Sequence, residues 1–395
     1  MGGSGTTAKP DLRQSRAGAG TDQRERLNRV ATKLKVGIAG AGNIFRVVHG
    51  PAWGSHPQVE IAAMCDERQE TGEASAREYG VTRIYTDYLA MLDRERLDIV
   101  VICTPNGFHS SMAVAALERG IHVFSEKPDA INPIEAQKMA DAAKQSGKIL
   151  MVMRNNRFTQ EAQFLKAYIE AGRMGEIYTG RTGWIRRRGI PGRGGWFTTK
   201  ALSGGGPLID LGVHMLDLAM WLMGNPQPVA VSGAVYTKFA DTTLSDSAHS
   251  AFGAAQEDGT FDVEDLASGF IRFDNGASLQ LECSWASNIM EEMKFLELRG
   301  TASGCQLKGE TLQLATEIGQ VLCDLTPRFG RNKTAPHTLN IHHFVECVLG
   351  RAEPIMQPEQ GVEIIRTLSA LYESARTGQE VSLLSARGQV GRVPS

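Results

Sequence analysis

The segment from Lys35 to Arg46 constrains the fold more than any other, because it reads as a short buried strand, a glycine turn and the start of a helix. Gly40 and Gly42 allow the backbone to turn tightly and to approach a pyrophosphate, which the N-terminus of the following helix would stabilise. Phe45 occupies the place of the third glycine of this fingerprint, and a Gly-x-Gly pattern alone is weak evidence. The other parts of a dinucleotide-binding unit must therefore be sought further along the chain.

A second apolar strand supplies the next part of such a unit. The run 59–65 is apolar and is followed directly by Asp66. A carboxylate at this place can accept hydrogen bonds from both ribose hydroxyls and would repel a 2′-phosphate, which favours NAD over NADP. Arg68 lies close by in the sequence and keeps NADP as the less favoured alternative. Asp66 could instead only cap the following helix, but the order of strand, turn and acid favours a cofactor site.

Two further strands lead into polar residues at their carboxyl ends, where open α/β sheets bind ligands. The runs 97–104 and 121–125 are both apolar. Lys127 closely follows the second run and is held by Pro128, which predicts a lysine over the cofactor crevice rather than one in solvent. The residues expected at the cofactor are Gly40, Gly42, Asn43, Ile44, Asp66, Arg68, Thr104, Pro105, Asn106, His109, Glu126 and Lys127.

The stretch from Ser203 to Gly224 is expected to carry the chemistry. Nearly continuous apolar residues predict a buried helix, which Asp210, His214 and Asp217 interrupt at spacings of four and three. All three side chains should project from one side of the helix. A carboxylate and an imidazole one turn apart in apolar surroundings can orient each other and shift each other's pKa. A core helix with a hydrogen-bonded histidine is the alternative, and for Asp217 a structural cap or ion pair is expected.

Together these motifs resemble the glucose-fructose oxidoreductase / inositol dehydrogenase / rhizopine catabolism (Gfo/Idh/MocA) family, from about Lys33 to about Leu384. The resemblance implies a Rossmann domain followed by an α/β domain with a large, mostly antiparallel open sheet, whose flat face forms the contact of a homo-oligomer. It implies reversible oxidation of a ring hydroxyl on a sugar or cyclitol. By position, Lys127 would hold the reacting hydroxyl, His214 would be the general base, and Asp210 would orient the imidazole. The family resemblance rests on the motifs Gly40-Ala-Gly42, Asp66, Thr104-Pro-Asn-x-x-His109, Glu126-Lys127-Pro128 and the stretch Gly204 to His214.

The expected organisation has four parts: a disordered or extended arm over 1–32, an NAD-binding Rossmann domain over 33–155, a substrate-binding and oligomerisation domain over 156–384, and a tail over 385–395. Alternating or apolar runs predict strands over 176–188, 228–239, 264–273, 277–285 and 293–300, and helices over 340–349 and 358–377.

Trp196 and Arg157 are the further residues expected at the substrate. Trp196 lies in a glycine-rich loop before the catalytic helix, where its ring could stack on a pyranose or only plug the loop. Arg157 matches a family position beside the sugar, with an interdomain ion pair as an equal alternative. The run 186–188 contains three arginines, which form either a solvated face or a contact to an acidic substrate. The segment 241–260 is expected to be a mobile loop that gates the site or mediates assembly.

Composition excludes several classes of partner. The formal net charge of −2 favours neither nucleic acid nor an anionic membrane, and no apolar run is long enough to span a bilayer. The first 32 residues lack the apolar core of a secretory signal. Six cysteines without CxxC spacing predict buried free thiols, a reducing cytoplasmic location and no zinc site. Of His337, His342 and His343, none has a carboxylate pair nearby for a metal, but one of them could touch substrate.

Three functional hypotheses remain open from the sequence alone. The first is net oxidation of a sugar, glycoside or cyclitol by exchangeable NAD. In the second, a retained NAD oxidises C3 of a glycoside transiently and permits elimination of the aglycone, or shuttles hydride between two sugars. The third is a sensor or repressor that binds the nucleotide without turnover, which the joint presence of Lys127 and His214 disfavours.

Overall fold

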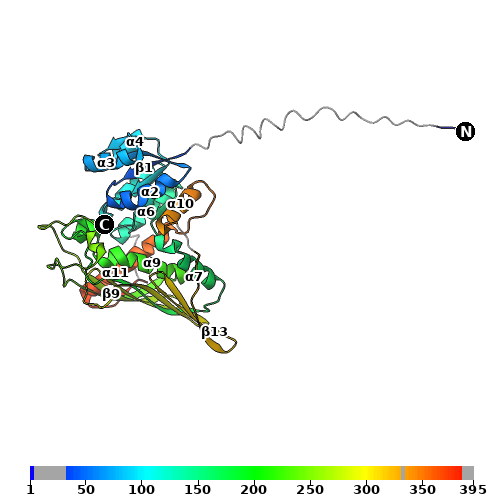
Figure 1. Ribbon diagram of the computed structural model, residues 1–395, viewed down its shortest axis with the longest axis vertical. Coiled ribbons are helices and arrows are strands. Elements are labelled where there is room, and N and C mark those ends of the chain that lie inside the picture. The colour runs from blue at the N-terminus through cyan, green and yellow to red at the C-terminus, as the bar shows by residue number, and fades with distance from the viewer. Residues whose placement is uncertain (4–32, 331–333, 385–395) are drawn as a thin grey trace, which may run out of the picture.

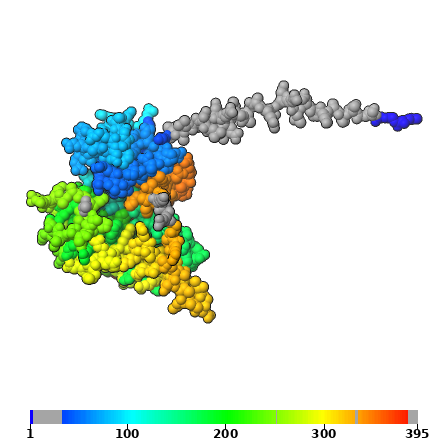
Figure 2. Space-filling model, in the orientation of Figure 1, coloured from blue at the N-terminus to red at the C-terminus, as the bar shows by residue number. Residues whose placement is uncertain are grey.

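The computed structural model describes residues 1–3, 33–330 and 334–384. It consists of two lobes, each built on its own sheet (Figures 1 and 2). The predicted tail, and the predicted arm apart from its first three residues, lie outside the described residues. Among the described helices, none combines the length and apolar character needed to cross a membrane. All six cysteines carry free thiols and five of them are buried, which confirms the predicted thiol state.

The first lobe has the predicted Rossmann architecture. Its strands follow the order β3-β2-β1-β4-β5-β6, and every pairing is parallel. The order reverses between β1 and β4, which opens a crevice at the carboxyl ends of these strands. The strands are β1 Leu34–Ala39, β2 Val59–Cys65, β3 Ile84–Tyr85, β4 Ile99–Ile102, β5 His122–Ser125 and β6 Leu150–Val152. The helical segments are η1 Phe45–His49, α2 Gly50–Ser55, α3 Gln69–Tyr79, α4 Tyr88–Arg94, η2 Asn106–Phe108, α5 His109–Glu118 and α6 Pro133–Ser146.

A late segment of the chain completes the core of this lobe. Helix α10 (Pro336–Val348) contributes Phe344 to the same buried cluster as Trp53 and Phe124. The ring of Phe344 lies 5.2 Å from that of Phe124 and 6.1 Å from that of Trp53, in edge-to-face contacts. In Figure 2 the orange atoms of this region lie against the blue first lobe. A division of the chain at 155 therefore cuts through a shared core.

The second lobe contains the predicted large, mostly antiparallel sheet. Its nine strands follow the order β14-β13-β12-β11-β7-β10-β9-β8-β15, and all neighbours are antiparallel except β7 and β10. All five predicted strands are present, and the sheet is extended by four strands that were not predicted. The strands are β7 Ile177–Ile185, β8 Pro228–Tyr236, β9 Leu266–Phe273, β10 Ser278–Ser284, β11 Met293–Gly300, β12 Ser303–Lys308, β13 Thr311–Ile318, β14 Val321–Leu325 and β15 Val381–Ser382.

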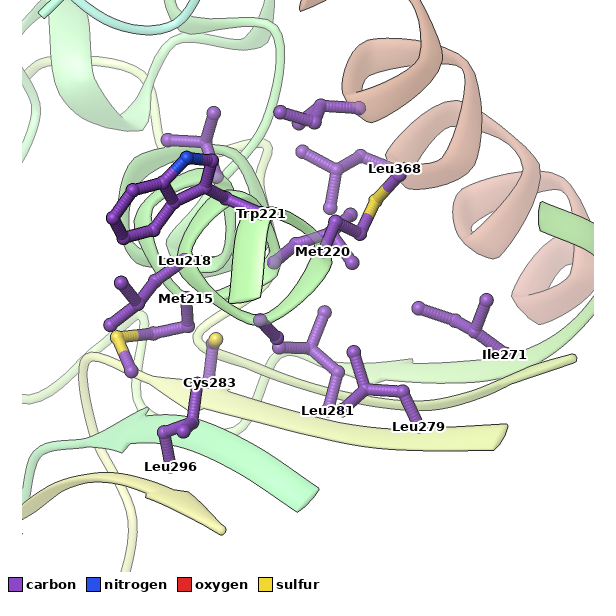
Figure 3. Close-up of a cluster of buried hydrophobic side chains, with 14 of the residues drawn as sticks. Met215, Leu218, Met220, Trp221, Ile271, Leu279, Leu281, Cys283, Leu296 and Leu368 are labelled. Atoms are coloured by element: carbon purple, nitrogen blue, oxygen red, sulfur yellow. The ribbon is translucent and has the colours of Figure 1, made fainter. Parts of the chain in front are cut away.

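Helices cover one face of this sheet (Figure 1). They include α9, whose Met215 side chain lies over Cys283 of β10 in Figure 3, while Met220 on its other side lies beside Leu368 of α11. This buried contact fixes the rotation of α9 about its axis. The helical segments are η3 Asn155–Phe158, α7 Gln160–Glu170, η4 Trp196–Thr198, α8 Lys200–Ser203, η5 Leu208–Gly212, α9 Val213–Leu222, η6 Ala248–Ala251, α10 Pro336–Val348 and α11 Pro358–Thr377.

The expected single helix between Ser203 and Gly224 is divided. Its first part, η5, is a wider π-helical turn that runs directly into α9. Buried Glu264 caps this turn, because its carboxylate accepts hydrogen bonds from the backbone N–H groups of Gly206 and Leu208, both at 3.0 Å. Turns of this kind are frequent at functional sites.

Candidate active site

A cavity of about 240 Å³ lies between the two lobes, and both lobes line it. Lys127 and His214, which the sequence predicted to converge, both belong to its lining. From the first lobe come Ile44, Cys103, Thr104, Asn106, Glu126 and Lys127. From the second lobe and α10 come residues that include Trp184, Arg186, Trp196, Asp210, His214, His249, Phe252 and His337.

Lys127 forms a cross-lobe ion pair with Asp210. Its Nζ donates to Oδ1 of Asp210 at 2.5 Å and to the Asp210 carbonyl oxygen at 3.2 Å. The other carboxylate oxygen, Oδ2, accepts a hydrogen bond from Nε1 of buried Trp285 at 2.9 Å. Burial opposes charge on Asp210, but the positive charges of Lys127 and Arg186 hold the pKa of this carboxyl below its usual value.

This arrangement corrects the predicted role of Asp210. The spacing of Asp210 and His214 suggested that the carboxylate orients the imidazole, but in the structure both carboxylate oxygens are engaged by Lys127 and Trp285. Helical spacing identifies neighbours on the same helix, whereas Lys127 comes from another strand end and provides a charged partner. Asp210 therefore positions the ammonium group.

His214 lies at the start of α9 and is half-buried in the cavity wall. Its ring centroid is 6.1 Å from that of Trp184. Burial, followed by the positive charges of Lys127 and Lys294, lowers the pKa of His214 well below its ordinary value. The imidazole is therefore neutral at neutral pH and can accept a proton.

The glycine turn fits a pyrophosphate. Gly40 has φ of +89°, and a Cβ there would lie 2.7 Å from the carbonyl carbon and oxygen of Cys103, so no other residue is tolerated. A Cβ at Gly42 would meet nothing within 4 Å, which leaves open space beside the turn. Phe45 is fully buried with its ring 5.4 Å from that of Tyr79. Its side chain therefore points into the core, away from the turn.

Asp66 stands at the predicted end of β2. Its Oδ2 accepts a hydrogen bond from the backbone N–H of Ala41 at 2.9 Å, and its Oδ1 accepts one from that of Arg68 at 3.0 Å. The carboxylate thus braces the turn and presents negative charge where a ribose would lie. The Arg68 side chain is largely exposed. Together with Gly40 and Gly42, Asp66 makes the site suitable for NAD.

Asn106 and His109 have structural partners on the cofactor side. Nδ2 of buried Asn106 donates to the carbonyl of Ser203 at 2.8 Å, which links the lobes. His109 is fully buried, with Nε2 2.9 Å from the Thr104 carbonyl oxygen and Nδ1 2.8 Å from that of Pro128. This position differs from the predicted cofactor contact, because the buried His109 ring connects the segment at Thr104 to the segment at Pro128 and is not exposed to the cavity. Pro105 precedes η2, and Asn43 is exposed beside the glycine turn.

Glu126 is held by a residue that no sequence motif identified. His49 is fully buried, and its Nε2 lies 2.7 Å from Oε1 of Glu126. Trp53 donates Nε1–H to Nδ1 of His49 at 3.3 Å, which leaves Nε2 to donate to the carboxylate. Burial opposes the charge, but His49 and Lys127 lower the pKa of Glu126 to about 2. Since His49 and Glu126 lie on different segments, no local pattern could have paired them.

Arg157 and Asp217 form a buried ion pair behind the cavity. Arg157 donates Nε–H to Oδ2 of Asp217 at 2.9 Å and Nη2–H to Oδ1 at 2.7 Å. Arg154 also donates Nε–H to Oδ1, at 2.8 Å. The ion pair predicted for Asp217 is confirmed. Arg157 forms an ion pair too, but within the second domain and not between the domains as its alternative role expected, and it is not among the residues that line the cavity.

Several other residues singled out in the sequence line the cavity. Trp196 does so with its ring stacked 3.8 Å from that of Phe197. His337 is the one lining residue of the three histidines considered. His249 and Phe252 come from the predicted mobile loop over 241–260, whose polar and aperiodic composition contains no signal for a cavity wall.

Comparisons with known proteins show relatives of both lobes. Residues 34–154 match the family model "Oxidoreductase family, NAD-binding Rossmann fold", and residues 162–304 match the "GFO/IDH/MocA C-terminal domain". D-glucoside 3-dehydrogenase of Escherichia coli (strain K12) is 36% identical over 354 residues, which cover 89% of this chain and 98% of that protein. The scyllo-inositol 2-dehydrogenase (NAD(+)) of Bacillus subtilis (strain 168) is 27% identical over 85% of this chain and 92% of its own length.

A solved structure shares the fold. Levoglucosan dehydrogenase in complex with NADH and levoglucosan superposes with a TM-score of 0.78 at 24% identity. The match covers 89% of this chain and 100% of that one.

Proposed function

This chain belongs to the GFO/IDH/MocA family of NAD-binding oxidoreductases, and from that premise we propose that it oxidises a ring hydroxyl of a sugar, glycoside or cyclitol. The main observation behind this proposal is that Lys127 and a neutral His214 line the same cavity, next to the crevice above the glycine turn. The similarity to a D-glucoside 3-dehydrogenase makes the C3 hydroxyl of a glucopyranoside the first candidate.

Gly40, Gly42 and Asp66 would hold NAD, which when bound supplies a hydride acceptor for the carbinol carbon. The negative charge of Asp66 favours NAD over NADP. Oxidation also requires removal of the hydroxyl proton. The neutral imidazole of His214 accepts that proton, and a positioned base of this kind contributes roughly 10²–10⁴-fold in rate.

Lys127 stabilises the oxygen from which the proton leaves. An ammonium group has three N–H donors, and Asp210 occupies two of them through Oδ1 and its carbonyl oxygen. The third donor is available for the substrate oxygen. Because Trp285 fixes the carboxylate and the carboxylate fixes the lysine, the positive charge is in place before charge develops on the substrate.

The walls of the cavity suit a sugar ring. Trp184, Trp196 and Phe252 present aromatic surface, which can cover the apolar faces of a pyranose. His249 supplies a polar group that can meet its hydroxyls. This mixture of flat apolar walls and a few polar groups is typical of small-molecule sites.

The test is NAD reduction by His214→Ala and Lys127→Met, measured with a panel of glucosides, aldoses and cyclitols. We expect each variant to lose at least about 100-fold in turnover while binding NAD normally in a separate titration. His342→Ala and Lys308→Met are matched controls, because His342 lies outside the cavity lining and Lys308 pairs with Glu291 at the surface. Near wild-type turnover by either active-site variant would overturn the assignment.

The same panel separates the alternatives. With an aryl glycoside, net oxidation yields reduced nicotinamide in proportion to sugar consumed. Release of the aglycone without accumulation of reduced nicotinamide identifies transient oxidation by a retained cofactor. Binding of NAD and sugar without any turnover identifies a sensor.

A further inference from the structure

Arg186 is a cavity-lining cation that the proposed reaction does not use. It follows the last residue of β7 and is buried, with 6% of its surface exposed. Its Nη1 donates to the carbonyl oxygen of Gly189 at 3.3 Å. Its Nε is buried and has no hydrogen-bond partner within the described part of the chain.

Arg186 differs from Lys127 and Arg187 in forming no ion pair with a carboxylate, because Asp210 and Glu292 act on its charge only from beyond 4 Å. Lys127 is paired with Asp210, and the adjacent Arg187 pairs with Asp246 at the surface. For Arg186, no carboxylate oxygen within the described ranges comes as close as 4 Å. A buried charge in this state is costly unless a partner of opposite charge arrives.

The guanidinium is nevertheless held in a defined place. Its Cζ lies 4.9 Å from the centroid of the Trp184 ring, in a cation–π contact. The backbone N–H of Arg186 donates to the Ser284 carbonyl at 3.0 Å, which anchors the residue to the end of β10. A rigid, unpaired guanidinium in a cavity wall is suited to recognise a carboxylate, which accepts charge-assisted hydrogen bonds from it.

We propose that Arg186 binds a carboxylate of the substrate, so that the preferred substrate is a uronic-acid glycoside rather than a neutral one. The inference rests on the proposed function, since it assigns the substrate class of the same cavity. Lys127 and His214 act at the ring hydroxyl that is oxidised. Arg186 meets the carboxylate from the wall of the same cavity and sets specificity without taking part in proton transfer.

The test compares two substrates that differ only at C6: methyl β-D-glucopyranoside and methyl β-D-glucopyranosiduronate. Wild-type protein is compared with Arg186→Met, Arg186→Lys and the matched surface control Arg187→Met. Turnover is followed by NAD reduction. Binding is measured separately from the fluorescence of Trp184 and Trp196, which line the cavity, so that affinity is read without chemistry.

We expect wild-type kcat/KM to favour the uronide by about 10-fold or more, and Arg186→Met to lower the value for the uronide by about 10- to 150-fold. The glucoside should change by less than about threefold in the same variant, Arg186→Lys should restore part of the preference, and Arg187→Met should leave it intact.

The outcomes separate the two proposals. Turnover of the glucoside with no preference for the uronide, or a preference that survives Arg186→Met, overturns the role of Arg186 and leaves the proposed function standing. If the uronide binds in an Arg186-dependent way but is not turned over, carboxylate recognition by Arg186 is supported and the proposed oxidation is contradicted. If neither sugar binds or reacts, both fail.

Discussion

Asp217→Asn should destabilise the protein more than any comparable loss of a surface charge. Asp217 has 1% of its surface exposed and accepts three charge-assisted hydrogen bonds from Arg154 and Arg157, which are themselves fully buried. Arg154 keeps Asp129 as a partner, whereas the acceptors that the rest of the described chain leaves to Arg157, the Ile355 carbonyl and Gln360, are neutral. Removal of one partner of a buried ion pair costs about 3–5 kcal/mol, because the remaining charge is left uncompensated.

The free energy of unfolding can be measured by urea denaturation, with Asp246→Asn as the matched control. Asp246 pairs with Arg187 in a half-exposed setting, so the same chemical change should cost only about 0–1 kcal/mol there. The double variant Arg157→Met/Asp217→Asn should recover part of the loss, since it removes the surplus charge as well. A loss at Asp217 no larger than the control, or no recovery in the double variant, would refute the reasoning.

Three further predictions concern the site. Lys294→Met should move the acidic limb of the kcat/KM–pH profile to higher pH. Burial lowers the pKa of Lys294 to about 8, so below that pH Lys294 is a cation that depresses the pKa of His214. Without this cation His214 is protonated at a higher pH, and an unmoved acidic limb would contradict the prediction. Asp66→Asn keeps an acceptor for the Ala41 N–H but removes the charge, so the NAD/NADP ratio of kcat/KM should fall by about 10-fold or more, and an unchanged ratio would show that Asp66 does not discriminate. Gly40→Ala combines a positive φ with a Cβ 2.7 Å from the Cys103 carbonyl, so NAD affinity measured by titration should be lost; normal affinity would place the cofactor elsewhere.

The parts of the fold that the sequence predicted are those with local signals. The glycine turn, the acid after β2 and the lysine after β5 follow buried strands directly, so strand order alone brings them to one crevice. Strand β11 and helix α11 coincide with their predicted bounds, because Gly300 and Gly378 end them sharply. The short strands β12 to β14 were not predicted, although β12 and β13 alternate between buried and exposed residues; most positions of β13 and β14 are exposed, so little buried apolar surface marks them.

The parts of the site that the sequence did not predict depend on contacts between distant segments. Asp210 was assigned to His214 because helical spacing is visible in a sequence, whereas its ion pair with Lys127 is formed only when the lobes meet. The pairing of His49 with Glu126 is hidden for the same reason. Arg186 was considered as part of an arginine run, but nothing in that run distinguishes the buried member from the exposed Arg187.

The position of α10 has a consequence for the order in which the molecule can be built. The helix that completes the hydrophobic wall around Trp53 and Phe124 is encoded near the far end of the chain. During synthesis from the N-terminus, the nucleotide-binding half must wait for this helix with one apolar side uncovered. The hydrophobic core of this half is thus completed only after residues 336–348 have emerged, so the two halves mature as one unit.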